Sequence, residues 1–207
     1  MNRGKIYVIA APSGAGKSTL VNALCKLDNN VQLSISHTTR GIRPGEEHGV
    51  NYFFTSVSDF KNMIEKNEFL EYAEVYGNLY GTNITTIKDF LATGKDILLE
   101  IDWQGAKQIR KLFNDAVLIF IAPPSLEILE KRLRDRKTDS QEVIEKRLSS
   151  AREDMSHAAE FDYIIINDDF DTALQDLCSI IRAGRNKTAR KLEIIKQKFD
   201  LNNGKEI

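Results

Sequence analysis

The amino-acid sequence predicts an α/β fold in which helices cover both faces of a parallel β-sheet. Continuous apolar runs of strand length alternate along the 207-residue chain with segments of helical period. This alternation is typical of parallel strands joined by crossover helices. The first apolar run also leads through a glycine-rich loop directly into a helix, as a strand–loop–helix unit requires. The length corresponds to one domain with a small insertion.

The strands of the predicted sheet are the apolar runs, and the helices are the segments between them. The strands are expected over Ile6–Ala10, Ile97–Ile101, Val117–Ala122 and Tyr163–Asn167. One helix begins at Lys17, and others are expected over Ala106–Phe113, Glu127–Arg134, Glu142–His157 and Thr172–Ala183. Apolar residues at helical spacing carry the helix assignments.

Residues 34–93 interrupt this alternation and predict a small mixed α/β insert. The segment contains a polar stretch from Ser34 to Gly49 and then short elements. These are a strand over Asn51–Phe54, a helix over Asp59–Lys66, a strand over Phe69–Val75, a turn bracketed by Gly77 and Gly81, and a helix over Thr85–Leu91. The core domain is therefore expected to comprise residues 1–33 and 94–184.

Residues 185–207 form a basic tail in which Leu192, Ile195 and Phe199 could make a helical stripe. We expect a helix packed on the body of the domain, and a contact with a second copy is the alternative.

Composition excludes several classes of function. The net charge of −1 and the pI of about 6.3 lack the basic excess typical of nucleic-acid binders. No apolar run is long enough to span a bilayer, and nothing resembles a signal peptide. Cys25 and Cys178 fall in segments that are expected to be helical. We therefore expect two buried free thiols rather than a disulfide or a metal-binding pair. The sequence therefore predicts a cytoplasmic protein without nucleic-acid or membrane partners.

The loop after the first strand predicts a nucleotide-phosphate site of the P-loop NTPase type. Gly14, Gly16, Lys17 and Ser18 match the end of the pattern G-x-x-x-x-G-K-[ST], and Ala11 replaces its first glycine. Both glycines can adopt positive φ, which turns successive backbone N–H groups toward one anion beside the positive end of a helix. Lys17 could reach the β- and γ-phosphates, and the Ser18 hydroxyl could bind Mg²⁺.

A second candidate phosphate site lies in the insert. Arg40 and Arg43 are close together in a loop with glycine hinges, and guanidinium groups bind phosphate in a bidentate manner. Tyr52 and Tyr80 could add hydroxyl donors. Two arginines in a loop are also common as solvated charges, so this pattern alone leaves both interpretations open.

Glu71 stands in the otherwise apolar stretch from Phe69 to Ala73. Its carboxylate either lies on a solvent face or points at a ligand. Guanine presents two parallel donors on its pairing edge, N1–H and the N2 amino group, and a carboxylate accepts both. Adenine presents an acceptor at this edge and would leave the carboxylate unpaired.

On these residues the chain resembles guanylate kinases from about Lys5 to about Ala183. The matching blocks are Ala11-Pro12-Ser13-Gly14-Ala15-Gly16-Lys17-Ser18-Thr19, Ser36-His37-Thr38-Thr39-Arg40, Arg43-Pro44-Gly45-Glu46, Tyr80-Gly81-Thr82, Asp102-Trp103-Gln104-Gly105 and Ala122-Pro123-Pro124-Ser125. Their order and spacing together are highly specific. The resemblance implies transfer of the γ-phosphoryl group of ATP to GMP with Mg²⁺, and GMP binding by the 34–93 insert.

The resemblance also implies roles for individual residues. The ATP-binding set would be Ala11, Pro12, Ser13, Gly14, Ala15, Gly16, Lys17, Ser18, Thr19 and Asn167, with Ser18 as the metal ligand. The GMP-binding set would be Ser36, Arg40, Arg43, Tyr52, Glu71, Tyr80, Thr82, Asp102 and Gly105. Arg132, Arg136 and Arg147 would be arginines of a helical lid over about residues 126–150, and with Lys17 and Arg40 they form the catalytic set. Glu100 stands where relatives often have Asp, near the metal.

Other functions share parts of this pattern. A GTPase would fit Asp102-Trp103-Gln104-Gly105, but Asn186-Lys187-Thr188-Ala189 lacks the Asp of an N-K-x-D guanine motif. A scaffold domain that binds phosphopeptides would usually lack an intact Lys17 and Ser18. A kinase of phosphorylated sugars would need no purine contact. The sequence gives no oligomeric state, and a homo-oligomer remains open.

Overall fold

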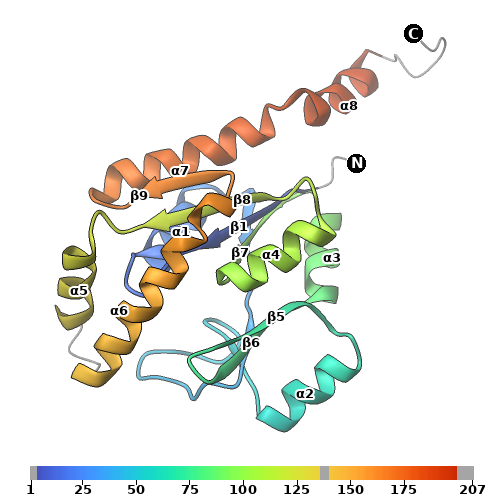
Figure 1. Cartoon of the computed structure of the whole chain (residues 1–207). Helices are drawn as coiled ribbons and strands as arrows, with labels where there is room; N and C mark the ends of the chain where they lie inside the picture. Colours follow the sequence, from blue (N-terminus) through green and yellow to red (C-terminus); the bar gives the residue numbers. More distant parts are fainter. Residues whose placement is uncertain (1–3, 136–139, 200–207) are drawn as a thin grey trace.

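The computed structural model describes residues 4–135 and 140–199 (Figure 1). Within these ranges the strands form two sheets. The larger sheet has the order β2 (Val31–Leu33), β7 (Asp96–Glu100), β1 (Ile6–Ala10), β8 (Val117–Ala122), β9 (Tyr163–Ile166). Every neighbouring pair in it is parallel. The predicted α/β class with a parallel sheet is confirmed.

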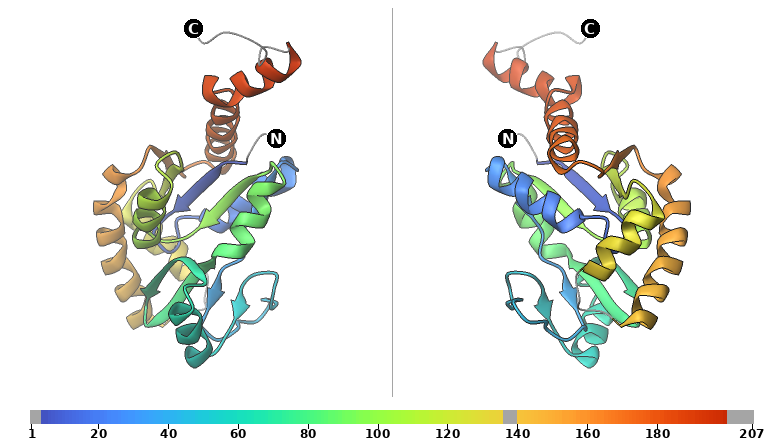
Figure 2. Two further views of the ribbon diagram at one scale, coloured as in Figure 1. Left: turned by 90° about the vertical axis from the view of Figure 1, so that its right-hand side faces the viewer. Right: turned by 90° about the vertical axis from the view of Figure 1, so that its left-hand side faces the viewer.

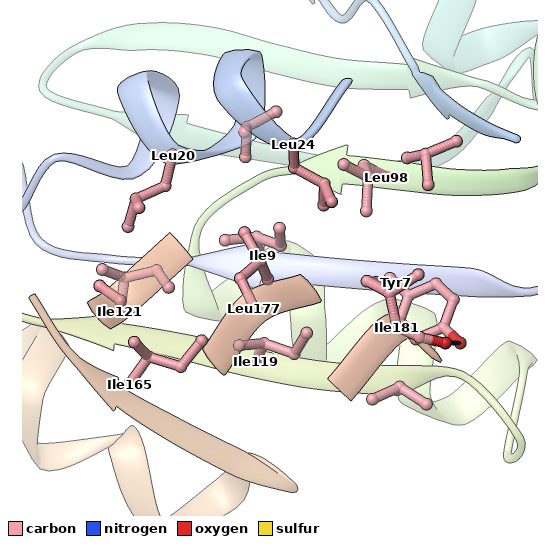
Figure 3. Packing of buried hydrophobic residues seen from close by; sticks show 14 residues of the cluster. Tyr7, Ile9, Leu20, Leu24, Leu98, Ile119, Ile121, Ile165, Leu177 and Ile181 are labelled. Carbon is pink, nitrogen blue, oxygen red and sulfur yellow. Dashed lines mark hydrogen bonds between the residues drawn. The ribbon is translucent and has the colours of Figure 1, made fainter. Parts of the chain in front are cut away.

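Helices pack on both faces of the larger sheet. Helices α1 (Lys17–Leu27) and α7 (Phe170–Arg185) cover one face, where Tyr7 and Ile9 of β1 meet Leu24 and Leu177 (Figure 3). Helices α3 (Ile84–Ala92) and α4 (Trp103–Leu112) cover the other face, toward which the alternate residues of β1 point. Burial on both faces explains why the strands are continuously apolar in sequence.

The smaller sheet has the order β4 (Phe53–Phe54), β3 (His37–Thr38), β6 (Asn78–Asn83), β5 (Phe69–Val75), and α2 (Val57–Glu65) lies beside it (Figure 1). The prediction that Gly77 and Gly81 bracket a turn was wrong for Gly81. Gly81 lies inside β6, where an added Cβ would lie 2.8 Å from a ring carbon of Phe69. This glycine serves close packing within a strand rather than a turn.

A helical pair flanks the larger sheet near the loop after β1. Helix α5 (Leu126–Asp135) packs on α6 (Gln141–Ser156) through buried Leu129, Leu133, Ile144 and Ala151, and a short 3₁₀ turn (Ala158–Glu160) follows. This pair falls in the expected lid region. Arg136 lies outside the described residues.

The C-terminal helix α8 (Thr188–Lys198) extends away from the sheet, at the end of the molecule opposite the insert (Figure 2). The expectation that its stripe packs on the body was wrong, because Leu192, Ile195 and Phe199 are 41%, 43% and 70% exposed. Asp96, which is 1% exposed, anchors the junction of α7 and α8 to the larger sheet.

The Asp96 carboxylate accepts hydrogen bonds from the Lys5 backbone N–H at 3.0 Å and from Arg185 Nε at 2.6 Å. Arg190 Nη1 lies 2.7 Å away as an ion pair without hydrogen-bond geometry. Among the helices of residues 4–135 and 140–199, none combines the length and apolar character of a membrane span.

Candidate active site

A cleft of about 580 Å³ opens where β1 and β7 end. Four parts of the chain line it: the loop after β1, the insert, the segment from the end of β7 into α4, and α6. The lining residues predicted from sequence are Ala11, Pro12, Ser13, Gly14, Gly16, Lys17, Ser18, Thr19, Arg43, Tyr52, Tyr80, Asp102 and Arg147. Ligands of parallel α/β sheets bind at this edge of the strands.

The loop from Ala11 to Gly16 has the shape of an anion site. Gly14 and Gly16 have φ of 97° and 92°, so both lie in the left-handed region that favours glycine. Gly16 is also the N-cap of α1, and its side-chain-free position leaves the first N–H groups of that helix open to a ligand. The backbone therefore presents donors and the positive end of a helix to the cleft.

Asn167 stabilises this loop from behind. Its side-chain amide is 6% exposed and donates to the Ala15 carbonyl oxygen at 2.7 Å. A Cβ on Gly16 would lie 2.3 Å from Asn167 Nδ2, so the glycine is required by packing as well as by φ. The Asn167 backbone carbonyl accepts from Arg132 Nη2 at 2.9 Å. The amide is thus committed to the loop, and its expected contact with adenine stays a prediction.

Lys17 and Ser18 begin α1 at the edge of the cleft. Lys17 Nζ donates to the Ile101 carbonyl oxygen at 3.1 Å and lies 4.0 Å from Glu100 Oε1. The Ser18 hydroxyl donates to the same Glu100 oxygen. A hydroxyl and a carboxylate side by side are hard oxygen donors of the kind that Mg²⁺ accepts.

Arg147 connects α6 to the phosphate loop. Its Nη1 donates to the Ser13 hydroxyl at 2.9 Å, across 134 positions of sequence. Of the three expected lid arginines, Arg147 lines the cleft, Arg132 lies behind the loop, and Arg136 is outside the described residues. One arginine of α6 therefore contacts the loop directly, and one arginine of α5 contacts Asn167 behind it.

Glu46 braces both arginines of the insert. The Arg40 guanidinium donates to Glu46 Oε1 at 2.7 Å, and the Arg43 backbone N–H donates to Glu46 Oε2 at 2.9 Å. Arg40 also lies over the Tyr52 ring, with 5.4 Å from its guanidinium carbon to the ring centre. Partial burial acts to raise the pKa of Glu46, but the hydrogen bonds from Arg40 and the Arg43 N–H, together with the charges of both arginines, lower the pKa overall. Glu46 therefore links the two arginines within one loop.

Glu71, in β5 of the insert, is buried at 3% exposure. It faces Thr82 across the β5–β6 pair, and the Thr82 hydroxyl donates to Glu71 Oε1 at 2.5 Å. Burial raises the pKa of this carboxyl to about 7, partly offset by Thr82. An added Cβ on Gly105 would lie 2.4 Å from Glu71 Oε2, so only glycine leaves room for this carboxylate against α4.

Asp102 caps α4 and lines the cleft. Its Oδ1 accepts from the Gly105 N–H at 2.9 Å, and its Oδ2 accepts from Gln104 Nε2 at 3.0 Å. Trp103, the first residue of α4, lines the cleft, and its ring stacks on His157 with 3.5 Å between ring centres. The stack links the start of α4 to the end of α6.

The sequence missed several residues of the cleft wall, which are Glu74, Val75, Tyr76, Gln104, Lys146, Ser150, Glu153 and Asp154. Asp154 has a pKa raised to about 6 by burial and by repulsion from Asp102. Asp154 was missed because its helix carries many charges, which are more often on a solvated face, and because no local motif includes this residue. Ser36, 7% exposed, lies with Arg40, Glu71, Thr82 and Gly105 behind the wall rather than on it.

The cleft has two sites that face each other. One is a glycine loop at the start of a helix beside a parallel sheet, and the other carries arginines and tyrosines. Together they define a class of enzyme. The class is the P-loop phosphotransferases that hold two phosphate-bearing substrates end to end, the nucleoside monophosphate kinases.

Comparisons with known proteins narrow this class. The family model described as "Guanylate kinase" matches residues 3–184. The chain is 56% identical over 190 residues to the guanylate kinase of Hydrogenovibrio crunogenus, covering 92% of this chain and 93% of the relative. It is 54% identical over 202 residues to that of Salmonella paratyphi A, covering 97% and 96%.

A crystal structure of guanylate kinase from Anaplasma phagocytophilum has a TM-score of 0.78 to this structure. The two chains are 34% identical, and the match covers 96% of this chain and 97% of the other. The chain belongs to the guanylate kinase family.

Proposed function

We propose that this chain transfers the γ-phosphoryl group of ATP to GMP and releases ADP and GDP. One observation carries the proposal. A phosphate loop with Lys17 and Ser18 faces the arginine-bearing insert across a single cleft, and the insert holds a buried carboxylate–hydroxyl pair, Glu71 and Thr82. Relatives that are 54–56% identical and carry the name guanylate kinase support the same activity.

The donor is held by the backbone of the loop and by Lys17. The N–H groups at the head of α1 bind the phosphates of ATP, and the Lys17 ammonium neutralises charge on the β- and γ-oxygens. Pro12 and Gly14 form the wall beside it. Because these donors are in place before the substrate binds, little reorganisation is needed during transfer.

The acceptor phosphate is held by Arg40 and Arg43, with Tyr52 and Tyr80 as hydroxyl donors. Bidentate guanidinium contacts orient one phosphate oxygen of GMP toward the γ-phosphorus. That oxygen forms the new P–O bond while the bond from the γ-phosphorus to the β–γ bridging oxygen breaks, and the electron pair leaves with ADP. No covalent intermediate with the protein is required.

Glu71 selects guanine over adenine. In its ionised form the carboxylate accepts from guanine N1–H and the N2 amino group, and Thr82 holds it in place. Adenine would leave a buried carboxylate without donors, which strongly disfavours its binding. Asp102, at the head of α4, lies beside this pocket and completes its acidic edge.

The side chains at the head of α1 fit a magnesium ion that enters with ATP. Ser18 and Glu100 offer oxygen ligands. Within residues 4–135 and 140–199 no group of three or more His, Cys, Asp or Glu could hold a metal unaided. This combination is typical of Mg²⁺ sites built mainly from substrate phosphates. When bound, the ion would neutralise negative charge on the phosphates of ATP.

Arg132, Arg136 and Arg147 add positive charge around the donor as the bond breaks. Arg147 already contacts the loop through Ser13. The lid over about residues 126–150 and the 34–93 insert close over ATP and GMP and exclude water, which would otherwise hydrolyse ATP.

Several finer expectations belong to this proposal. They are acceptance of dGMP, a role in purine nucleotide salvage and GMP recycling, a cytoplasmic location, and no nucleic-acid or membrane partner. Self-association through the exposed stripe of α8, formed by Leu192, Ile195 and Phe199, is a further one. Sedimentation of the full chain and of Ile195→Lys tests it, since a charge in the stripe would shift a dimer toward monomer.

The proposal is tested by coupled ADP release with ATP and each of GMP, dGMP, AMP, CMP and UMP. We expect turnover with GMP, and with dGMP if the 2′-hydroxyl is not required. Equal turnover of AMP would refute the role of Glu71, and ADP release without any acceptor would indicate a nucleotide hydrolase instead.

Lys17→Ala separates the donor site from the acceptor site. Loss of the ammonium group is expected to lower kcat by about a hundred- to thousandfold, as for the removal of one stabilising donor. GMP affinity, measured by calorimetry, should remain near that of the wild type. Loss of GMP binding in a folded Lys17→Ala protein would mean that the two pockets are interchanged.

A further inference from the structure

The hairpin between β5 and β6 turns on a residue that its geometry disfavours. Val75 pairs with Asn78, so the turn consists of Tyr76 and Gly77, with φ of 52° and 77°. Two-residue hairpin turns with positive φ at both positions strongly prefer Asn-Gly or Asp-Gly. An aromatic residue in the left-handed region is strained, so the turn itself gives no reason for a tyrosine at this position.

Tyr76 and residues of α6 line the same cleft. The α6 residues include Arg147, Ser150 and Asp154, and the tip of the hairpin lies beside that helix (Figure 1). Tyr76 is 37% exposed, and partial burial of its phenol raises its pKa, while Ser150 acts in the opposite direction. The hairpin of the insert and α6 therefore share one wall of the cleft at Tyr76 and Ser150.

The hairpin that carries Tyr76 is anchored to the core domain. Gln108 of α4 accepts from the Tyr72 backbone N–H at 3.3 Å and donates to the Tyr72 carbonyl oxygen at 2.8 Å. Gln104 donates to the Glu74 carbonyl oxygen at 3.5 Å. These bonds hold β5 against α4, so the tip of the hairpin is a fixed support for whatever it touches.

Helix geometry passes this support to the donor site. Ser150 follows Arg147 by three residues and precedes Asp154 by four, so all three share one face of α6. Arg147 is the residue of that face that reaches Ser13 in the phosphate loop. Fixing Ser150 therefore fixes the base of the Arg147 side chain one turn away.

We propose that Tyr76 is a positioning residue for phosphoryl transfer: its ring supports α6 so that Arg147 stays aimed at the phosphate loop. The inference rests on the proposed function and extends it. It links the acceptor-binding insert to the lid over the donor. The strained turn is the conformational cost of placing a phenol, rather than a short amide, at the tip.

The test compares wild type, Tyr76→Asn, Tyr76→Phe and Ser150→Ala in thermal unfolding and in single-turnover transfer from ATP to GMP, which excludes product release. Asn relieves the strained φ, so Tm should rise by about 2–4 °C. The transfer rate should nevertheless fall by about ten- to a hundredfold, because Arg147 loses its alignment. The KM for ATP should rise more than the KM for GMP. The transfer rate of Tyr76→Phe should fall less than that of Tyr76→Asn. Adding Ser150→Ala to Tyr76→Phe should not lower the transfer rate further.

Asn67→Gly is the matched control, since Asn67 is exposed in the same insert with φ of 54° and lies off the cleft. Its transfer rate should equal that of the wild type. A Tyr76→Asn protein with an unchanged transfer rate would overturn the inference. So would a lower Tm together with the slower rate, because the ring would then only hold the fold together. Absence of transfer by the wild type would instead defeat the proposed function.

Discussion

At the scale of single residues, Glu71 combines a negative charge with burial. Its carboxylate is 3% exposed, takes one hydrogen bond from Thr82, and has a pKa raised to about 7 by burial. A buried carboxylate with unused acceptor capacity is costly in a fold unless a ligand supplies donors. Guanine supplies two, which is why the residue is interpreted as the base-reading group.

Glu71→Gln should lower kcat/KM for GMP by about a hundred- to thousandfold, because the amide presents an N–H donor where guanine also presents one. The preference for GMP over AMP should shrink by a similar factor. Steady-state assays with both acceptors measure this. Glu65→Gln, at the exposed end of α2, is the matched control and should behave as wild type. Unchanged selectivity in Glu71→Gln would place the guanine elsewhere.

Glu71 should also make the nucleotide-free protein less stable as pH rises. Its folded pKa, about 7, lies above the usual 4.5, so between these values the folded chain binds more protons than the unfolded chain. The free energy of unfolding attributable to Glu71 therefore falls as pH rises through this window and levels off above it. Asp154, with a pKa of about 6, contributes with the same sign at lower pH.

Urea unfolding of wild type and Glu71→Gln between pH 5 and pH 8 measures the effect, with pH values spanning the shifted pKa. The wild type should lose stability relative to the variant as pH rises. Parallel curves would show that Glu71 does not titrate in this range.

Residues of the site differed in how far the sequence could predict them. Lys17 and Ser18 belong to a local motif whose spacing is set by the phosphate they bind, so one segment sufficed. Tyr76 and Asp154 have no such motif, because they reach the cleft only when the hairpin and α6 fold against each other. Arg40 was partly predictable, because its partner Glu46 is only six residues away in the same loop.

At the scale of elements, the apolar runs predicted the core strands well, because strands buried on both faces must be continuously apolar. β1, β5 and β8 have the expected bounds. The predicted starts of α4 and α7 were too late, because an N-cap residue fixes where a helix begins and the apolar period does not show it. Asp102 caps α4 and Asp169 caps α7, so each helix begins before its first apolar period. The short strands β2 and β3 lack a period and were missed.

The anchor between α7, α8 and the larger sheet predicts a stability effect. Asp96→Ala should lower the free energy of unfolding by about 3–5 kcal/mol, because Arg190 would lose its ion-pair partner, the Lys5 N–H would lose its acceptor, and Arg185 would keep only Asp28 in a partly buried site. Asp89→Ala, on the exposed side of α3, should change it by less than about 0.5 kcal/mol. Equal effects of the two substitutions in denaturant unfolding would contradict this role for Asp96.

At the scale of the whole molecule, the cleft joins parts of the chain that no local pattern connects. The loop after β1, the insert and α6 meet at the end of the sheet where parallel strands present their carboxyl termini. The motifs and the family resemblance assign ATP to the loop and GMP to the insert, and that assignment stays a prediction. Their facing arrangement, and the contact of the insert with the lid helix, follow from tertiary packing and could not be predicted from sequence.

The central claim is that GMP lies with its base on Glu71 and its phosphate on the arginine pair of the insert. A crystal structure of the chain with GMP tests it most directly. The account predicts guanine N1–H and the N2 amino group within hydrogen-bond distance of the Glu71 carboxylate, and the phosphate bound by Arg40 and Arg43. A purine remote from Glu71, with its phosphate clear of both guanidinium groups, would contradict it.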